Sequence, residues 1–187
     1  MLTCTNPIRR IEPYILYFML YAVFGWCYEV FLEVVIYHWG FTNRGVLFGP
    51  YCPIYGVGAM LFLLCFSRLM QLRGSTIFRL CKPMLIFLGT MAVATAVELA
   101  ATYLLEWTIG SWPWQTYADY AYNFQARIAL SPSVRFGIGG VLFLYVMQPM
   151  FAWLVGKLGP KTMHIVVFTV LMVVCIDITA TVLAHIL

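Results

Sequence analysis

Apolar residues run along this chain in long, almost unbroken stretches that short polar segments separate. An α-helix needs about 20 mostly apolar residues to cross the hydrocarbon core of a bilayer. Five stretches approach or exceed that length, and we expect helices at Tyr14–Trp39, Pro53–Leu69, Pro83–Leu105, Val134–Val155 and Met163–Ile186. The pattern predicts an all-α, polytopic transmembrane helix bundle of about five spans, forming a single transmembrane domain over residues 1–187.

The segment between the third and fourth spans, residues 106–133, is rich in tryptophan and tyrosine. Both side chains favour the headgroup layer, where one end is apolar and the other is wet. Two structures fit Trp114–Ile128: a short helix that lies in the interface, or an ordinary ordered loop. In either case we expect an aromatic interfacial segment between spans three and four.

Composition supports the membrane assignment, because 63% of the residues are hydrophobic and only 10% are charged. A soluble domain carries about 25% charged residues. The basic residues lie at the ends of apolar stretches, so a nucleic-acid partner is not expected. The six cysteines are scattered without a C-x-x-C motif, which favours small apolar residues over metal ligands. We expect neither a metal nor a cofactor.

Orientation follows from the lysines and arginines, which are enriched in cytoplasmic loops. If the five spans alternate in direction, eight of the 11 basic residues fall on the side of the N-terminus. This distribution predicts a multi-pass protein of the cytoplasmic membrane with its N-terminus in the cytoplasm and its C-terminus outside. The first apolar stretch is too long for a signal peptide and has no A-x-A site, so we expect it to remain as a span.

Six of the seven acidic residues fall in the outer half of the membrane or beyond it; the exception is Glu12. Three helices carry polar residues at a spacing of four, which places each set on one helix face: Gly25, Glu29 and Glu33; Glu98, Thr102 and Glu106; Asp177, Thr181 and His185. A charge that faces lipid costs several kcal/mol, about 3 on insertion scales. These faces should therefore meet one another or water.

One interpretation is an outward-facing acidic cavity lined by Glu29, Glu98 and Asp177, with three arginines near its mouth: Arg44, Arg127 and Arg135. The alternative is a set of ion pairs that fix helix packing. We expect Arg44 to share a site with Glu29. Three acids near span ends, Glu33, Glu106 and Asp119, are expected to be solvated.

Catalytic and nucleotide-binding motifs are absent from the sequence. The segment Gly156–Thr162 lacks phosphate-loop spacing and predicts a tight turn between helices. Gly137, Gly139 and Gly140 are expected to allow close helix contact. Two alternatives stay open, although a non-enzyme is favoured. One is an intramembrane enzyme that acts on a lipid-linked or apolar substrate with Glu29 or Glu98 as general base, and the other is a membrane scaffold that transports nothing.

Two sequence blocks resemble a known family. The first is Gly25-Trp26-Cys27-Tyr28-Glu29 followed by the segment from Asn43-Arg44-Gly45 through Gly49-Pro50-Tyr51-Cys52-Pro53-Ile54-Tyr55-Gly56. The second, looser block comprises Trp114, Tyr117, Asp119, Tyr120, Asn123 and Arg127-Ile128. Together they resemble the bacterial membrane-protein family described as putative ABC-transporter type IV (CmpB-like), over roughly residues 14–145.

The resemblance implies a permease-like or transport-associated protein of the bacterial inner membrane. Such a protein needs its ATP-binding subunit as a separate chain and works with further membrane subunits; the small size also favours a homo-oligomer. The family positions and the polar faces together give these expected substrate-binding residues: Glu29, Glu98, Arg44, Asn43, Asp119, Asn123, Arg127 and Asp177.

Overall fold

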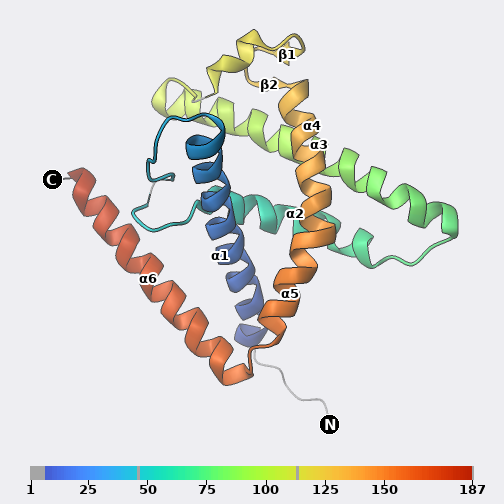
Figure 1. Ribbon diagram of the computed structural model, residues 1–187, viewed down its shortest axis with the longest axis vertical. Coiled ribbons are helices and arrows are strands. Elements are labelled where there is room, and N and C mark those ends of the chain that lie inside the picture. The colour runs from blue at the N-terminus through green and yellow to red at the C-terminus, as the bar shows by residue number, and fades with distance from the viewer. Residues whose placement is uncertain (1–6, 46, 113, 187) are drawn as a thin grey trace. The chain divides into compact units, whose positions relative to one another are not determined.

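The computed structural model describes the backbone of residues 7–45, 47–112 and 114–186, with the side chains of 7–10, 109, 185 and 186 left out (Figure 1). Cys4 and Val46, which enter the sequence arguments above, lie outside the described residues. The elements are α1 (Pro7–Phe31), η1 (Leu32–Ile36), α2 (Pro53–Gln71), α3 (Thr76–Ile109), η2 (Gln115–Asp119), β1 (Asn123–Phe124), β2 (Ile128–Ala129), α4 (Leu130–Leu142), η3 (Phe143–Met147), α5 (Gln148–Gly156) and α6 (Pro160–Ile186).

The described residues contain five helical spans that are long and apolar enough to cross a membrane. These are Ile11–Ile36, Pro53–Gln71, Thr76–Thr108, Leu130–Gly156 and Pro160–Ala184. The predicted all-α transmembrane bundle is therefore confirmed. The tight turn predicted around Gly156–Thr162 is also present, because α5 ends at Gly156 and α6 begins at Pro160.

The third helix starts earlier than the sequence pattern predicts. We expected it to begin at Pro83, yet α3 begins at Thr76, where the side chain of Ser75 accepts a hydrogen bond from the Phe78 N–H at 3.3 Å. Membrane helices tolerate an internal proline because neighbouring groups satisfy the freed carbonyl. The helix ends at Gly110, whose φ of 79° is left-handed, and the Gly110 N–H bonds to the Glu106 carbonyl at 3.0 Å. Glycine adopts that conformation without a steric penalty.

Two of the spans contain a π-helical turn. The first, η1, continues α1 through Leu32–Ile36, and the second, η3, joins α4 to α5 through Phe143–Met147. Such turns insert an extra residue into the helix and often occur at functional sites. In this chain η1 contains Glu33, the last residue of the polar face predicted for the first span.

The aromatic segment between spans three and four is an ordered loop. It consists of the short 3-10 turn η2 and an antiparallel hairpin that pairs Asn123 with Ala129 and Phe124 with Ile128. The interpretation of Trp114–Ile128 as a short interfacial helix was wrong. Side-chain hydrogen bonds stabilise the loop instead. The Asn123 amide bonds to three backbone groups of the same segment, and such local bonds favour turns and disfavour a helix.

The chain divides into two compact units, residues 1–61 with 149–187 and residues 62–148. The expectation of a single domain over 1–187 stays a prediction. In the first unit, α1 and α6 approach each other near their first residues, where Leu16, Val155 and Val167 form a buried apolar cluster (Figure 1). In the second unit, α3 packs along α4, and the hairpin lies beside the end of α3 (Figure 1).

Close helix contact depends on glycines in both units. A Cβ at Gly25 would collide with the Tyr55 ring of α2, and a Cβ at Gly140 would collide with the Thr90 side chain of α3. A Cβ at Gly137 would likewise collide with the Phe87 ring, at 2.6 Å, but Gly139 has no atom within 4 Å of the position a Cβ would take. The expectation of close contact is thus confirmed for Gly137 and Gly140 and wrong for Gly139.

Candidate functional site

The loop between α1 and α2, residues 37–52, gathers most of the polar motif residues of the first unit. Its anchor is Glu33 of η1, which is 4% exposed. Arg44 contacts both carboxylate oxygens of Glu33, from Nη2 at 2.8 Å and from Nε at 2.9 Å. The Thr42 hydroxyl donates a third bond at 2.6 Å. The expectation that Glu33 is solvated was wrong, because the loop folds back and covers it.

Asn43 fixes the shape of this loop. Its side-chain oxygen accepts a hydrogen bond from the Trp26 indole N–H at 2.8 Å. Its amide nitrogen donates to the carbonyls of Leu47 at 3.2 Å and Phe48 at 2.9 Å. The resemblance implied that Asn43 binds substrate; its observed contacts are with α1 and with its own loop. These bonds tie the glycine-rich end of the loop to the last part of α1.

Asp177 of α6 is held by the other end of the same loop. Its carboxylate accepts hydrogen bonds from the backbone N–H of Phe48 at 3.0 Å and of Gly49 at 2.8 Å. The hydroxyl groups of Tyr51 and Thr181 also donate to it. A carboxylate with four donors is well satisfied without a cation. Asp177 thereby fixes loop 37–52 to α6, as Glu33 fixes it to η1.

Glu29 lies about one helical turn before Glu33 and has a different partner. The hydroxyl of Tyr55, in the first turn of α2, donates a hydrogen bond to it. Gly25, one turn earlier on α1, allows the Tyr55 ring to reach this position. The Glu29 side chain is only half-buried. Glu29 and Asp177 are thus both partly accessible, but Glu29 is bonded by α2 and Asp177 by loop 37–52.

Two titratable groups of the loop are perturbed by these neighbours. Burial, reinforced by the Asp177 carboxylate, raises the pKa of Tyr51 to about 12. Burial and the negative charge of Glu29 raise the pKa of the Cys52 thiol, while Arg44 opposes the shift. The Cys52 thiol donates to the Arg44 carbonyl at 3.4 Å. Both groups are therefore neutral donors at physiological pH and hold the loop closed.

In the second unit, Arg127 belongs to the turn between β1 and β2 and is buried, with 8% of the residue exposed. Its guanidinium lies 4.3 Å from the centroids of both the Tyr103 and Trp112 rings. Nη2 forms an ion pair with Glu106 at 2.5 Å. The Nε and Nη1 atoms are buried without a hydrogen-bond partner among the described residues. Arginine stacks well on aromatic faces, and each unpaired donor has a desolvation cost.

Glu98 accepts a hydrogen bond from the Tyr117 hydroxyl at 2.9 Å, which joins α3 to the turn η2. Burial and this carboxylate raise the pKa of Tyr117. The second carboxylate oxygen of Glu98 is buried and has no partner within the described part of the chain. The sequence pattern placed Glu98 on a polar face correctly, but it gave no indication of Tyr117 as its donor.

The remaining predicted residues are more exposed. Asp119 is at the surface of η2, and Asn123 holds the hairpin turn. Arg135 is exposed at the start of α4, where it lines a groove with the hairpin residues Tyr120 and Tyr122. The described residues contain no cluster of three or more His, Cys, Asp or Glu side chains that could hold a metal ion.

The predicted site residues thus fall into two groups. Asn43, Arg44, Glu29 and Asp177 lie around loop 37–52 in the first unit. The other four, Glu98, Asp119, Asn123 and Arg127, belong to the second unit, where Glu98 bonds to η2 and Arg127 to α3. Sequence reasoning missed the contributions of Glu33, Tyr51 and Tyr103. For Tyr51 a signal was available, because it lies within the first block that resembles the family.

Five apolar helices with acids and arginines fixed by loops at their ends define a multi-pass helical membrane protein. The model of one protein family, described as "Putative ABC-transporter type IV", matches residues 16–182. The chain belongs to this family. No curated protein and no solved structure gives a significant match.

Proposed function

We propose that this chain is the membrane-embedded subunit of an ATP-driven transport system. The observation that carries the proposal is the family match, which extends over residues 16–182 and includes all five spans apart from their outermost residues. These 187 residues contain no nucleotide-binding motif. ATP hydrolysis would therefore take place on a separate ATP-binding subunit, and the pathway would be completed by further membrane subunits or by further copies of this chain.

The proposed orientation places the ATP-binding subunit against the basic side of the protein. With the N-terminus in the cytoplasm, the connections 72–75 and 157–159 face the cytoplasm as well. They carry or adjoin Arg68, Arg73, Arg79, Lys82, Lys157 and Lys161. Lys82 is already engaged with the carbonyl groups of Met70 and Leu72, where it satisfies the end of α2. The exposed Arg73 is the residue that we propose contacts the partner.

In each unit, taken by itself, an acid of the proposed outer half would then lie at an entrance of a transport pathway. Glu29 supports this role best in the first unit, since it is half-buried in a span and its observed donor is a neutral phenol. In the second unit Glu98 is the candidate, because it is half-buried in a span and one of its carboxylate oxygens has no partner among the described residues. Intramembrane acids face a polar pathway or a partner because exposure to lipid is costly. Glu33, Asp177, Asn43 and Arg44 would position the loop beside this entrance.

Affinity purification in a mild detergent tests the partner. An ATP-binding subunit should co-purify with the wild-type chain and be identified by mass spectrometry. Arg73→Glu should lose it, because the charge change would repel the acidic surface that we propose it contacts. Arg135→Glu makes the same change at an exposed arginine on the proposed outer side and should retain it. Purification of the intact wild-type chain without any ATP-binding subunit would contradict the proposal.

A further inference from the structure

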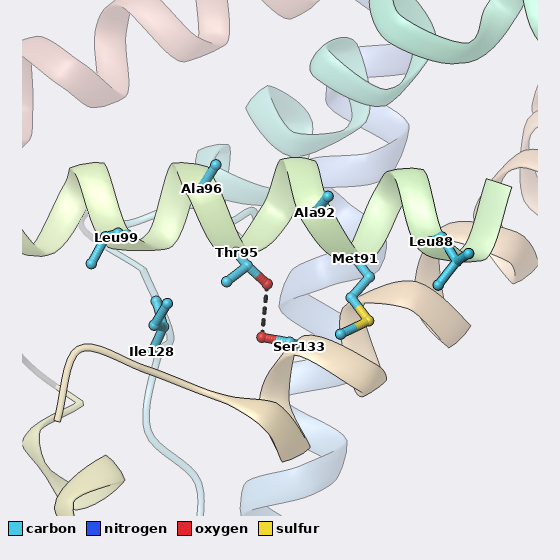
Figure 2. Close-up of a pocket in the computed structure, with 8 residues that line it drawn as sticks. All are labelled: Leu88, Met91, Ala92, Thr95, Ala96, Leu99, Ile128 and Ser133. Atoms are coloured by element: carbon cyan, nitrogen blue, oxygen red, sulfur yellow. Dashed lines mark hydrogen bonds between the residues drawn. The ribbon is translucent and has the colours of Figure 1, made fainter. Parts of the chain in front are cut away.

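An apolar groove follows one face of α3 in the second unit (Figure 2). Its volume is about 370 Å³, within the range of ligand pockets. It is lined by Leu88, Met91, Ala92, Thr95, Ala96, Leu99, Ile128 and Ser133. The two hydroxyl groups in this lining bond to each other, from Thr95 to Ser133 at 2.7 Å. The groove therefore offers an occupant an almost entirely apolar surface.

The length of the groove corresponds to one leaflet of a bilayer. From Leu88 to Leu99 the helix rises about 16 Å at 1.5 Å per residue. The hydrocarbon core is about 30 Å thick, so one leaflet supplies about half of that. Small side chains at Ala92 and Ala96 keep the groove open, and both are exposed. An acyl chain that lies along the helix fits this surface.

The buried arginine lies on the same helix face, beyond the outer end of the groove. Leu99, Tyr103 and Glu106 follow one another at spacings of four and three, so they share one face of α3. Tyr103 and Glu106 hold Arg127, whose neighbour in the chain, Ile128, lines the groove. Nε and Nη1 of Arg127 are buried without partners among the described residues. These donors lie where the tryptophans and tyrosines indicate the headgroup layer.

We propose that this face of α3 binds one phospholipid, with the headgroup phosphate at Arg127 and one acyl chain in the groove. A guanidinium is well suited to phosphate, because its planar donors match the phosphate oxygens. A single phospholipid would supply phosphate oxygens to the unpaired donors of Arg127 and an acyl chain to the apolar groove. This proposal does not depend on the transport function and would hold for a scaffold as well.

Native mass spectrometry tests it, with the full chain purified in a phosphate-free detergent and three probes added in turn. Dioleoylphosphatidylglycerol should be retained as one tightly bound copy. Dioleoylglycerol has the same acyl chains without the phosphate and should bind at least about tenfold more weakly, as expected for the loss of a charge-assisted bond. Inorganic phosphate, which lacks the acyl chains, should not be retained.

Substitutions locate the site. Ala92→Phe fills the groove and should weaken retention of the phospholipid by at least about tenfold. Ala100→Phe makes the same change at an exposed alanine of α3 outside the groove and should leave it unchanged. Arg127→Gln should lose the lipid, whereas Glu106→Gln, which breaks the same ion pair but leaves the arginine, should retain it.

Equal binding of dioleoylglycerol and dioleoylphosphatidylglycerol would overturn the role of Arg127. Unchanged binding by Ala92→Phe would overturn the role of the groove, and retention of inorganic phosphate without the lipid would overturn the proposal as a whole. If Arg127→Gln fails to fold, the comparison of the two lipids and the two alanine variants still decides the outcome.

Discussion

Arg44 forms an ion pair with Glu33, through two nitrogens at 2.8 and 2.9 Å from the two carboxylate oxygens. The acid is 4% exposed and the arginine side chain 35% exposed, so the pair closes loop 37–52 over the end of α1. Glu29, which the sequence had suggested as the partner of Arg44, bonds to Tyr55 instead. Loop 37–52 is therefore attached to the last turn of the first span through this ion pair.

The ion pair predicts that the effects of substitutions at Arg44 and Glu33 on the free energy of unfolding are not additive. In a double-mutant cycle, Arg44→Leu with Glu33→Leu should show a coupling energy of about 1–3 kcal/mol, because each single change leaves a charge without its partner. Arg44→Leu with Glu29→Leu is the matched control and should be additive within about 0.5 kcal/mol. The measurement is denaturant unfolding in detergent. Additivity in the first cycle would show that the ion pair does not hold the loop.

The raised pKa of Tyr51 predicts loss of stability at high pH. The phenol ionises near pH 10 in the unfolded chain and at about pH 12 in the folded chain. Between these values the folded state retains a proton that the unfolded state has lost, so the Tyr51 contribution is present below pH 10 and disappears as the pH rises to 12. The wild-type melting temperature should fall more steeply over this range than that of Tyr51→Phe. Parallel pH profiles of the two proteins would contradict the contact with Asp177.

The close approach of α4 to α3 predicts opposite behaviour of two adjacent glycines. Gly140→Ala should destabilise the protein by about 1–3 kcal/mol, because the new methyl group collides with Thr90. Gly139→Ala should be neutral or stabilising, since nothing lies within 4 Å and alanine favours helix. Thermal unfolding in detergent compares the two variants. A loss of stability in Gly139→Ala equal to that in Gly140→Ala would show that α4 packs in another rotation.

The proposed orientation, with the N-terminus in the cytoplasm, predicts which connections a membrane-impermeant thiol reagent reaches in intact cells. In a cysteine-free background, Ser111→Cys between spans three and four should be labelled from outside. Arg73→Cys, between spans two and three, should be labelled only after the membrane is permeabilised. Both positions are exposed, so accessibility does not distinguish them. The reverse labelling pattern would place the N-terminus outside.

The five spans could be predicted because lipid selects long apolar helices by length and composition alone. Their ends could not, since these depend on local caps. The Ser75 cap starts α3 at Thr76, seven residues before Pro83, where hydropathy had placed the first residue. The hairpin was missed for a related reason. Aromatic composition indicates depth in the membrane, but Asn123 and its backbone bonds decide between helix and loop.

The sequence predicted which helix faces carry acidic residues, but it did not predict which residues bond to those acids. A spacing of four places Glu29 and Glu33 together on an ideal helix, but the π-helical turn at Leu32–Ile36 changes the helical register there. The contacts of Asp177 with Phe48 and Gly49 join residues far apart in the chain. No spacing rule predicts such contacts, because they depend on how the loop folds back onto α6.

The most direct test of the proposed function is the ATP hydrolysis rate of the co-purified ATP-binding subunit in proteoliposomes, measured with and without this chain. The chain should raise the rate, because a transport system couples hydrolysis to its membrane subunit. Glu29→Gln should abolish that increase, while Gly139→Ala, which leaves packing unchanged, should retain it. The same hydrolysis rate with and without the wild-type chain would contradict its role as the membrane subunit of an ATP-driven transport system.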